Sequence, residues 1–498
     1  MVDCYGSHMI KYRDVYRKKI HISFLPLGLC AGFLAGALLA MLLAWSLSWP
    51  WSIVSAFCFV VSGVLHGWGR VLFALIAGLF LGAWRVSWQN QDLALLAEQY
   101  NQIVTLSGTV STPPEVKEKD LRITIEAISF NYSTLRLKSQ VYVMLPASNK
   151  TGINRSDRII LYGKLQPGFG NYGGFLYRPQ LISVQSPRPP DFAWQIRSFL
   201  SERVQQVLNR EQSSLALGYL FGDKSLLSES LDTEIKIVGL SHLIVTSGFH
   251  LGIIVSLARK LFGKISRQLA AVGSIALILA FTAITGFSAS MSRAGLVASL
   301  SLIAWLVGRK FHPARLIIYS AAITVVLRPE YLTNIGFLLS FAAYSGIIFI
   351  MPLLEKFFYG PSPTSKIATA IFPTIAAQAL CLPISIYYFG RIPIVGALAG
   401  IIVSPTIALV MALTLCTSVL PFCAVFTQIL VDFHLNVIHF FASIPWGSVE
   451  VEAGHPQIFL VYLPILAILI YLFWRTGHRY RPRLALDNSQ KYGKIYPC

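Results

Sequence analysis

The sequence predicts a polytopic α-helical membrane protein of about twelve spans with one small all-β domain inserted on the extracytoplasmic side. The 498 residues are 55% hydrophobic and only 13% charged, a composition too apolar for an ordinary soluble enzyme. About twelve apolar stretches are long enough to cross roughly 30 Å of hydrocarbon as helices. Between residues 101 and 186 the pattern changes to short strands separated by turns.

Five regions follow one another along the chain. We expect N-terminal transmembrane helices in residues 1–90, the β domain in 91–188, an amphipathic helix and entrance segment in 189–235, a second transmembrane domain in 236–475 and a basic tail in 476–498. The first three spans are expected near 22–48, 50–67 and 70–88, and the others between about 236 and 475. The first apolar run is too long for a cleaved signal peptide, and we interpret it as a retained anchor.

The distribution of the net charge of +19 predicts the orientation of the chain. Basic clusters lie before the first span, at 259–267, at 309–315 and after the last span, and short cytoplasmic loops are the ones that carry excess Lys and Arg. Both termini are therefore expected in the bacterial cytoplasm, and residues 90–235 are expected on the outer side of the inner membrane. The chain as a whole is expected to be in contact with membrane lipid. None of the seven cysteines lies in that outer part, so no disulfide framework is expected.

The β domain is expected to be a small OB-like barrel. Its five strands are predicted at Ile103–Ser111, Leu121–Phe130, Gln140–Leu145, Arg158–Leu165 and Leu181–Gln185. Five short strands close most economically into such a barrel, whose open face commonly binds single-stranded nucleic acid or oligosaccharide. The fold alone does not choose between these two ligands.

Cations and aromatic residues are interleaved along the β domain. Residues 100–188 hold eleven Lys and Arg against five Asp and Glu, a net +6 that the orientation rule does not require outside the membrane. Cations beside aromatic faces are typical of sequence-tolerant single-strand binding. The alternative is that the aromatic rings form the barrel core and the cations a solvated surface or a contact with anionic lipid. The candidate DNA-binding cations are Lys117, Lys119, Arg122, Arg136, Lys138, Arg158 and Lys164, and the aromatic residues are Tyr132, Tyr142, Phe169, Tyr172, Phe175 and Tyr177.

Residues 191–208 follow the β domain and have apolar side chains at helical spacing with polar ones between. This pattern predicts an amphipathic helix suited to the membrane surface.

A polar island interrupts the apolar half at 239–252. It carries His242, Thr246, Ser247, Gly248 and His250, and on one continuous helix its two histidines and Thr246 would share about 80° of surface. We interpret Ser247-Gly248 as a helix break that lines a pore, because exposed backbone at membrane depth is tolerated only against protein or water. Two alternatives stay open: hydrogen bonds between helices, and a membrane-embedded hydrolase that uses Ser247 with His242 or His250.

A second island at 286–295 places Arg293 in the first turn of a span, where a cation opposes the helix dipole. The compensating anion is expected to be a phosphate or the carboxylate of Asp223 or Glu229, unless the side chain extends to the outer interface. A third signal is Gln378, which either lines the same path or bonds a neighbouring helix. A small-solute transporter capped by the β domain is a further alternative, but no convincing inverted repeat supports it.

Read in order, these segments resemble the ComEC family of competence channels, which import transforming DNA, and the resemblance covers nearly the whole chain. It rests on Leu-Phe-Gly-Asp-Lys-Ser-Leu-Leu-Ser at 220–228, on Gly-Leu-Ser-His-Leu-Ile-Val-Thr-Ser-Gly-Phe-His-Leu-Gly at 239–252, on Gly-Phe-Ser-Ala-Ser at 286–290 with Arg293, on Gly-Phe-Leu-Leu-Ser-Phe at 336–341, and on Gln378 with Pro383 and Phe389-Gly390. Two positions depart from the family pattern, which often has Gln where Leu338 stands and Asn where Gly400 stands.

The resemblance implies a channel for single-stranded DNA, with the β domain capturing DNA outside. Asp223 would frame the entrance, the 242–250 segment and Gln378 would line the channel, and Arg293 would meet phosphates. Many family members end in a metallo-β-lactamase-like domain, and its His-x-His-x-Asp-His motif is not found in this sequence. We therefore expect no catalytic residue, metal or cofactor. With no Walker-type phosphate loop, the expected partners are a cytoplasmic helicase or translocase, a periplasmic DNA-receptor protein and a separate nuclease.

Overall fold

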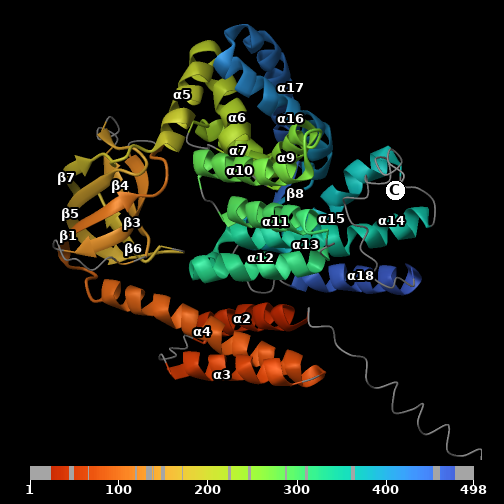
Figure 1. Ribbon diagram of the computed structural model, residues 1–498. Coiled ribbons are helices and arrows are strands. Elements are labelled where there is room, and N and C mark those ends of the chain that lie inside the picture. The colour runs from red at the N-terminus through yellow and green to blue at the C-terminus, as the bar shows by residue number, and fades with distance from the viewer. Residues whose placement is uncertain are drawn as a thin grey trace, which may run out of the picture.

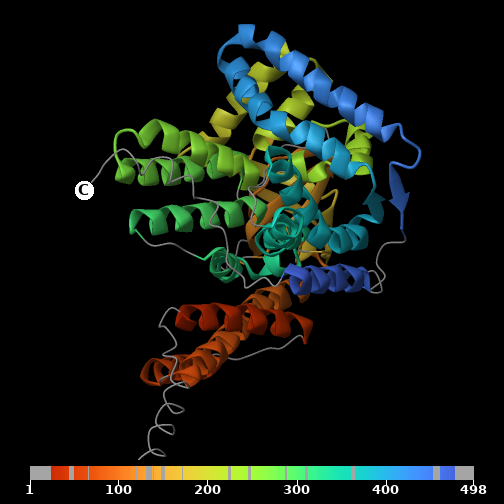
Figure 2. The same ribbon diagram turned by 90° about the vertical axis from the view of Figure 1, so that its right-hand side faces the viewer.

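The structure is a computed structural model that describes residues 24–43, 50–65, 67–117, 120–130, 137, 139–146, 152–170, 172–222, 226–244, 248–286, 289–308, 312–360, 365–451 and 460–476. Figures 1 and 2 show three parts: a layer of N-terminal helices, a β domain at one side, and a larger body of helices above the N-terminal layer.

The N-terminal layer consists of α2 (Phe24–Leu42), α3 (Pro50–Val64) and α4 (Trp68–Ala97). Glycines allow α2 and α4 to pack backbone against backbone. A Cβ atom added at Gly32 or Gly36 would overlap the carbonyl oxygen of Leu75 or Leu79, respectively. Small residues four apart are a common means of helix association in membranes, where the hydrophobic effect does not drive helices together.

Helix α4 extends to Ala97, beyond the expected end near residue 88, because its last turns belong to the β domain. Leu96 is fully buried in the core of that domain, together with strand residues such as Leu106 and Val141. The expected boundary at residue 91 therefore falls within a continuous helix.

The β domain contains all five expected strands and two more. The strands are β1 (Ile103–Val110), β2 (Glu115–Lys117), β3 (Asp120–Phe130), β4 (Val141–Pro146), β5 (Arg158–Pro167), β6 (Gly174–Tyr177) and β7 (Gln180–Gln185). They pair in the order β1-β3-β4-β6-β5, and β5 pairs back with β1, which closes a barrel-like circuit. The pairing of β4 with β6 is parallel, and the other pairings in the circuit are antiparallel. Strand alternation fills the interior with Leu, Ile and Val.

The expected amphipathic helix is present as α5 (Phe192–Val207), and Asp191 caps its first turn by accepting a hydrogen bond from the Trp194 backbone. Phe192, Ile196 and Phe199 recur at helical spacing and are exposed. Helix α5 therefore presents an apolar stripe to its surroundings.

In the described residues of the second half of the chain, the regular structure is helical except for two short strands that pair with each other, β8 (Arg391–Pro393) and β9 (Ser448–Glu450). Its helices are α6 (Arg210–Phe221), α7 (Glu229–Val238), α8 (Ser241–Ile244), α9 (Gly248–Phe262), α10 (Arg267–Thr285), α11 (Ala289–Leu306), α12 (Pro313–Leu327), η2 (Pro329–Thr333), α13 (Ile335–Phe349), α14 (Met351–Tyr359), α15 (Lys366–Phe389), α16 (Gly396–Val419), η3 (Pro421–Cys423), α17 (Ala424–Ala442) and α18 (Tyr462–Thr476). Helix α6 is buried along most of its length and packs against α5, α16 and α17.

Within the described residues, seven helical stretches are long and apolar enough to cross a membrane, and four shorter apolar helices accompany them. The protein is thus built for a multi-pass arrangement, while the figure of twelve spans stays a prediction. The two histidines of the polar island at 239–252 lie in two separately bounded helices, and the expected break at Ser247-Gly248 falls partly outside the described residues. His242 lies in α8 and His250 in α9, with α7 ending before both.

Candidate functional site

Five aromatic side chains of the β domain form one cluster on its outer surface, which we call the aromatic platform: Tyr142, Phe169, Tyr172, Phe175 and Tyr177. Alternation along β4 sends Val141 and Val143 into the core and Tyr142 outward. The Tyr142 ring centroid lies 5.4 Å from that of Phe169, 5.0 Å from Tyr172 and 6.1 Å from Phe175. Phe169 and Tyr177 are more than half exposed, so the rings are not the barrel core.

Arginines border the aromatic platform. The Arg178 guanidinium lies 5.4 Å from the centre of the Tyr177 ring and 3.1 Å from an Asp120 oxygen. Arg122 on β3 lies close enough to Tyr142 to act on its hydroxyl electrostatically, and the Arg122 Nε is buried with no hydrogen-bond partner among the described residues. Burial raises the pKa of the Tyr142 hydroxyl, and the positive charge of Arg122 lowers it by a smaller amount. The platform therefore combines exposed ring faces with cations.

The expected DNA-binding cations are only partly brought together. Arg122 borders the platform, and Lys164 lies on the outward face of β5, two residues before Gln166, which pairs with Phe175. Arg158 is exposed at the far end of β5, where it pairs with Thr109 and Gln185 rather than with the platform strands. Only the backbone of Lys117 is described, in β2, and Lys119, Arg136, Lys138 and Tyr132 lie outside the described residues.

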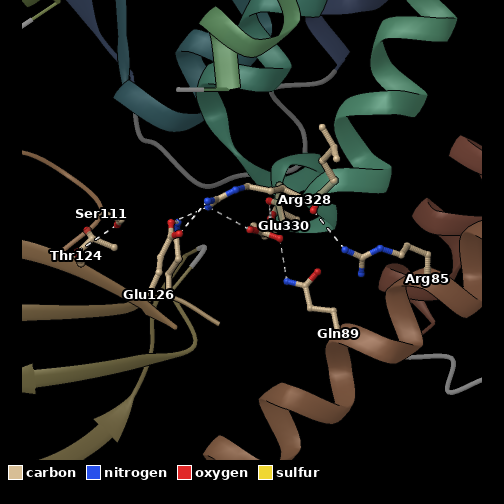
Figure 3. Close-up of polar contacts among 10 residues, drawn as sticks. Arg85, Gln89, Ser111, Thr124, Glu126, Arg328 and Glu330 are labelled. Carbon is tan, nitrogen blue, oxygen red and sulfur yellow. Dashed lines mark hydrogen bonds and ion pairs between the residues drawn. The ribbon is translucent and has the colours of Figure 1, made fainter. Parts of the chain in front are cut away.

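A polar junction joins the β domain to both groups of helices, as Figure 3 shows. The Glu126 carboxylate accepts two hydrogen bonds from Arg328, at 2.7 and 2.9 Å, and one from Gln140 at 2.5 Å. Gln89 of α4 donates to Glu330 at 3.1 Å, and the Arg85 Nε donates to the Val326 carbonyl at 2.8 Å. The junction thus holds β3, α4 and the end of α12 together.

Electrostatics favour the ionised form of Glu126. Burial by itself raises the pKa of this carboxyl, but the hydrogen bonds and charge of Arg328 outweigh burial and leave the pKa below its usual value. Sequence reasoning missed the pair, because 202 positions separate its two residues. The available signal was the isolated Arg328-Pro329-Glu330 after an apolar helix.

A second junction joins the β domain to the end of α10. Asp191 accepts hydrogen bonds from Arg155 at 2.9 and 3.0 Å and from the Ser156 hydroxyl at 2.7 Å. The same Arg155 donates to the Ala283 carbonyl at 3.0 Å, while Arg197 of α5 donates to the Thr285 carbonyl at 3.1 Å. Two guanidinium groups therefore satisfy carbonyls at the negative end of the α10 dipole.

Arg293 lies in the second turn of α11 rather than the first, and it is buried. Its guanidinium carbon is 5.7 Å from the centre of the Phe341 ring and 5.3 Å from that of Tyr344, both on α13. A Cβ added at Gly248 would come within 3.2 Å of an Arg293 terminal nitrogen. The Arg293 Nε has no hydrogen-bond partner among the described residues. The two polar islands of the sequence thus meet around this side chain.

The other expected channel residues lie in different environments, and some of them are outside the described residues. His250 is 1% exposed, and its Nε2 lies 2.8 Å from the Tyr219 carbonyl oxygen. Gln378 is half-buried on α15, between Pro373 and Pro383. Asp223, Thr246 and Ser247 lie outside the described residues, as does the side chain of His242. Of the positions that depart from the family pattern, Leu338 packs beside Phe337 and Phe341, and Gly400 is buried in α16.

Sequence reasoning also missed a buried polar group around α17. The His434 Nε2 lies 2.7 Å from the Thr406 hydroxyl, and Gln212 donates to Asp432 at 2.7 Å. The His434 Nδ1 and the Tyr219 hydroxyl are buried without a hydrogen-bond partner in the described part of the chain. An Asp and a His within an apolar stretch were the signal for it.

Comparison with known proteins gives one family and one relative. The family model for competence proteins matches residues 219–476, about half of the chain. ComE operon protein 3 of Bacillus subtilis (strain 168) is 22% identical over 251 residues, which span 48% of this chain and 32% of that protein. The chain thus matches about a third of the length of this relative. No solved structure matches it.

Proposed function

The chain belongs to the competence protein family, and we propose from this premise that it conducts single-stranded DNA across the bacterial cytoplasmic membrane during natural transformation. One observation carries the proposal: aromatic rings lie together on the outer surface of the β domain with arginines beside them. Each base of a single strand offers a flat face to such rings, and each phosphate offers a negative charge to the cations.

We propose that the β domain is an OB-like barrel used as the DNA receptor. The circuit β1-β3-β4-β6-β5, with one parallel pair, supports this assignment. OB-folds bind oligonucleotides on the face of their second and third strands and with adjoining loops. The short β2 lies outside the barrel circuit, so the second and third strands of the circuit in chain order are β3 and β4, which carry Arg122 and Tyr142. Phe169 comes from the loop before β6. The platform thus coincides with the surface that this fold commonly uses.

The proposed orientation places the β domain outside and both termini in the cytoplasm. The C-terminal end of α10 lies beside the β domain, through the hydrogen bond from Arg155 to the Ala283 carbonyl. The 19 residues of α10 span about 28 Å at 1.5 Å per residue, so Arg267 lies at the opposite end, next to the basic turn after α9. Because short cytoplasmic loops carry excess Lys and Arg, that opposite end is assigned to the cytoplasm.

We propose that the strand passes from the platform toward Arg293 and Gly248. A buried guanidinium whose Nε lacks a partner in the described part of the chain supports a role in binding phosphate within the helical body. The segment around Asp223 would frame the entrance, and Gln378 would line the later path.

We further propose transport without catalysis, because the Nε2 of His250 is engaged with the Tyr219 carbonyl. No metal or cofactor enters the proposal, and a cytoplasmic helicase or translocase, a periplasmic DNA receptor and a separate nuclease are its proposed partners.

The decisive experiment for the receptor role is the salt dependence of binding by the purified full-length protein. Replacing Lys117, Lys119, Arg122 and Lys138 together by Gln should reduce the slope of log K against log salt by about 3, at about 0.7 per cation for single strands. Lys236→Gln on α7, whose ammonium pairs with Asp232, is the control and should leave the slope unchanged. An unchanged slope in the fourfold variant contradicts the face assignment.

The channel role is tested by Arg293→Gln in cells, with DNA taken into the periplasm and transformants scored separately. Periplasmic uptake should persist while transformation falls, because the lost cation lies inside the helical body. Arg293→Lys keeps a charge without the planar guanidinium and should give an intermediate loss. Full transformation in the Gln variant, at normal protein level, would remove Arg293 from the path.

A further inference from the structure

A cavity of about 120 Å³ lies where the β domain, α4 and η2 meet. Its lining includes Gln89, Asn90 and Leu93 from α4, Ser139 and Tyr172 from the β domain, and Glu330 from η2. One buried water needs roughly 10–15 Å³ on the same kind of measure, so the cavity is several times larger than a single water requires.

Two buried polar atoms of the cavity wall lack partners among the described residues: the Gln89 Oε1 and the Ser139 Oγ. The Ser139 side chain is almost wholly enclosed, at 4% exposure. The Gln89 amide cannot simply turn, because its Nε2 donates to Glu330 at 3.1 Å (Figure 3). Buried polar groups are normally satisfied, so the wall is suited to a ligand that both donates and accepts hydrogen bonds.

The cavity chemistry selects an uncharged ligand. Among the described lining residues the only charged group is the Glu330 carboxylate, and Arg328 lies 3.8 Å from it and balances its charge. The wall therefore offers neither an unpaired cation to a phosphate nor an unpaired anion to a cation. Leu93, Val86 and Met41 supply apolar walls, while Asn90 adds a further amide. A flat molecule with apolar faces and hydrogen-bonding edges fits both kinds of wall, and a nucleobase has this chemistry.

The cavity adjoins the aromatic platform. Tyr172 belongs to both, since it lines the cavity and its ring lies 5.0 Å from that of Tyr142. We infer that the cavity binds one unpaired nucleobase of a strand whose neighbouring bases stack on the platform. This inference rests on the proposed function and adds a base-binding subsite at the junction between the β domain and the helices.

Photocrosslinking tests the inference directly. Full-length protein in lipid nanodiscs is incubated with an oligothymidylate that carries one 4-thiothymine, irradiated, digested and mapped by mass spectrometry. We expect crosslinks in two places: on the platform, at Tyr142 or Phe169, and on α4, at Asn90 or Leu93. Asn90→Leu fills the cavity and removes an amide, so it should lower the α4 crosslinks about tenfold and leave the platform crosslinks unchanged.

The outcomes separate the inference from the proposed function. Crosslinks confined to the platform overturn the base-binding subsite and leave the DNA-receptor role standing. Crosslinks on α4 that persist undiminished in Asn90→Leu likewise overturn it, because the strand then lies outside the cavity. No crosslink anywhere, with a salt-independent affinity, counts against the receptor role itself. The platform crosslinks also report that the Asn90→Leu protein is folded.

Discussion

Replacing Glu126 by Gln is expected to loosen the attachment of the β domain to the helices. The substitution keeps the size of the side chain but removes the charge that two Arg328 nitrogens contact at 2.7 and 2.9 Å. Arg328 then keeps its positive charge in a partly buried place without its main partner. The expected result is a lower unfolding temperature and faster hydrogen exchange in β3 and η2.

The size of the effect follows from burial. The side chains of Arg328 and Glu126 are 34% and 24% exposed, so the pair lies between a surface pair and a fully buried one. Surface pairs contribute about 0–1 kcal/mol, and breaking a buried pair costs roughly 3–5 kcal/mol. After allowance for solvent screening we expect a loss of about 2 kcal/mol. Unfolding entropy is about 2.1 cal/mol/K per residue, so for the 498-residue chain this loss lowers the unfolding midpoint by roughly 2 °C.

A double-mutant cycle with Glu126→Gln and Arg328→Gln measures the coupling by thermal unfolding in detergent. Asp120→Asn is the matched control, because it removes a carboxylate from the same strand whose partner, Arg178, is half exposed. The control should cost less than about 1 kcal/mol. The reasoning is refuted if the coupling energy between Glu126 and Arg328 is no larger than the stability lost in the Asp120→Asn control.

Acidification offers a parallel measurement on the unmodified protein. The pKa of Glu126 is lowered in the folded state, so its contribution is fully present above the unfolded carboxyl pKa of about 4.3. It is lost as the pH falls through the lower, folded value. Glu126→Gln should flatten this part of the stability profile.

Three further outcomes are expected. Tyr142→Ala should weaken single-strand binding by about 1–3 kcal/mol in fluorescence anisotropy, because a stacking face is lost, whereas Phe199→Ala on α5 should not change it. Gly32→Val should reduce the folded yield in size-exclusion chromatography, because its Cβ meets the α4 backbone, while Gly63→Val has open space and should be tolerated. Because the pKa of Asp191 is lowered in the folded state, acidification should reduce the protection of amide hydrogens from exchange at the start of α5. Asp191→Asn keeps the helix cap but not the charge, so hydrogen exchange at this site should no longer depend on acidification.

Much of the fold was accessible from local patterns. Alternation marked β1, β3, β4, β5 and β7 to within a residue or two, because one face of each strand is buried. The short β2 and β6 were missed, since three or four residues among prolines and glycines give no periodic signal. The separate helices α7 and α8 were not expected, because an apolar run does not show where one helix ends and the next begins.

The candidate site was also predicted only in part from the sequence. The aromatic residues, the cations and Arg293 could be identified as candidates from the sequence, because aromatic rings can stack on bases and cations can bind phosphates. The sequence left open whether the rings were core or surface, and strand pairing decides this by placing Tyr142 beside Phe175 on the outer face. The cavity at α4 had no sequence signal, because its walls come from five separate stretches of the chain.

By itself, the sequence determined that this chain is a multi-pass membrane protein of the competence family with a small β domain, because apolar length, strand alternation and motif order are local properties. Only the tertiary structure decided which residues meet. Glu126 and Arg328, or Gly248 and Arg293, become neighbours through long-range packing. That packing depends on the joint burial of many side chains, and no short window of sequence contains it.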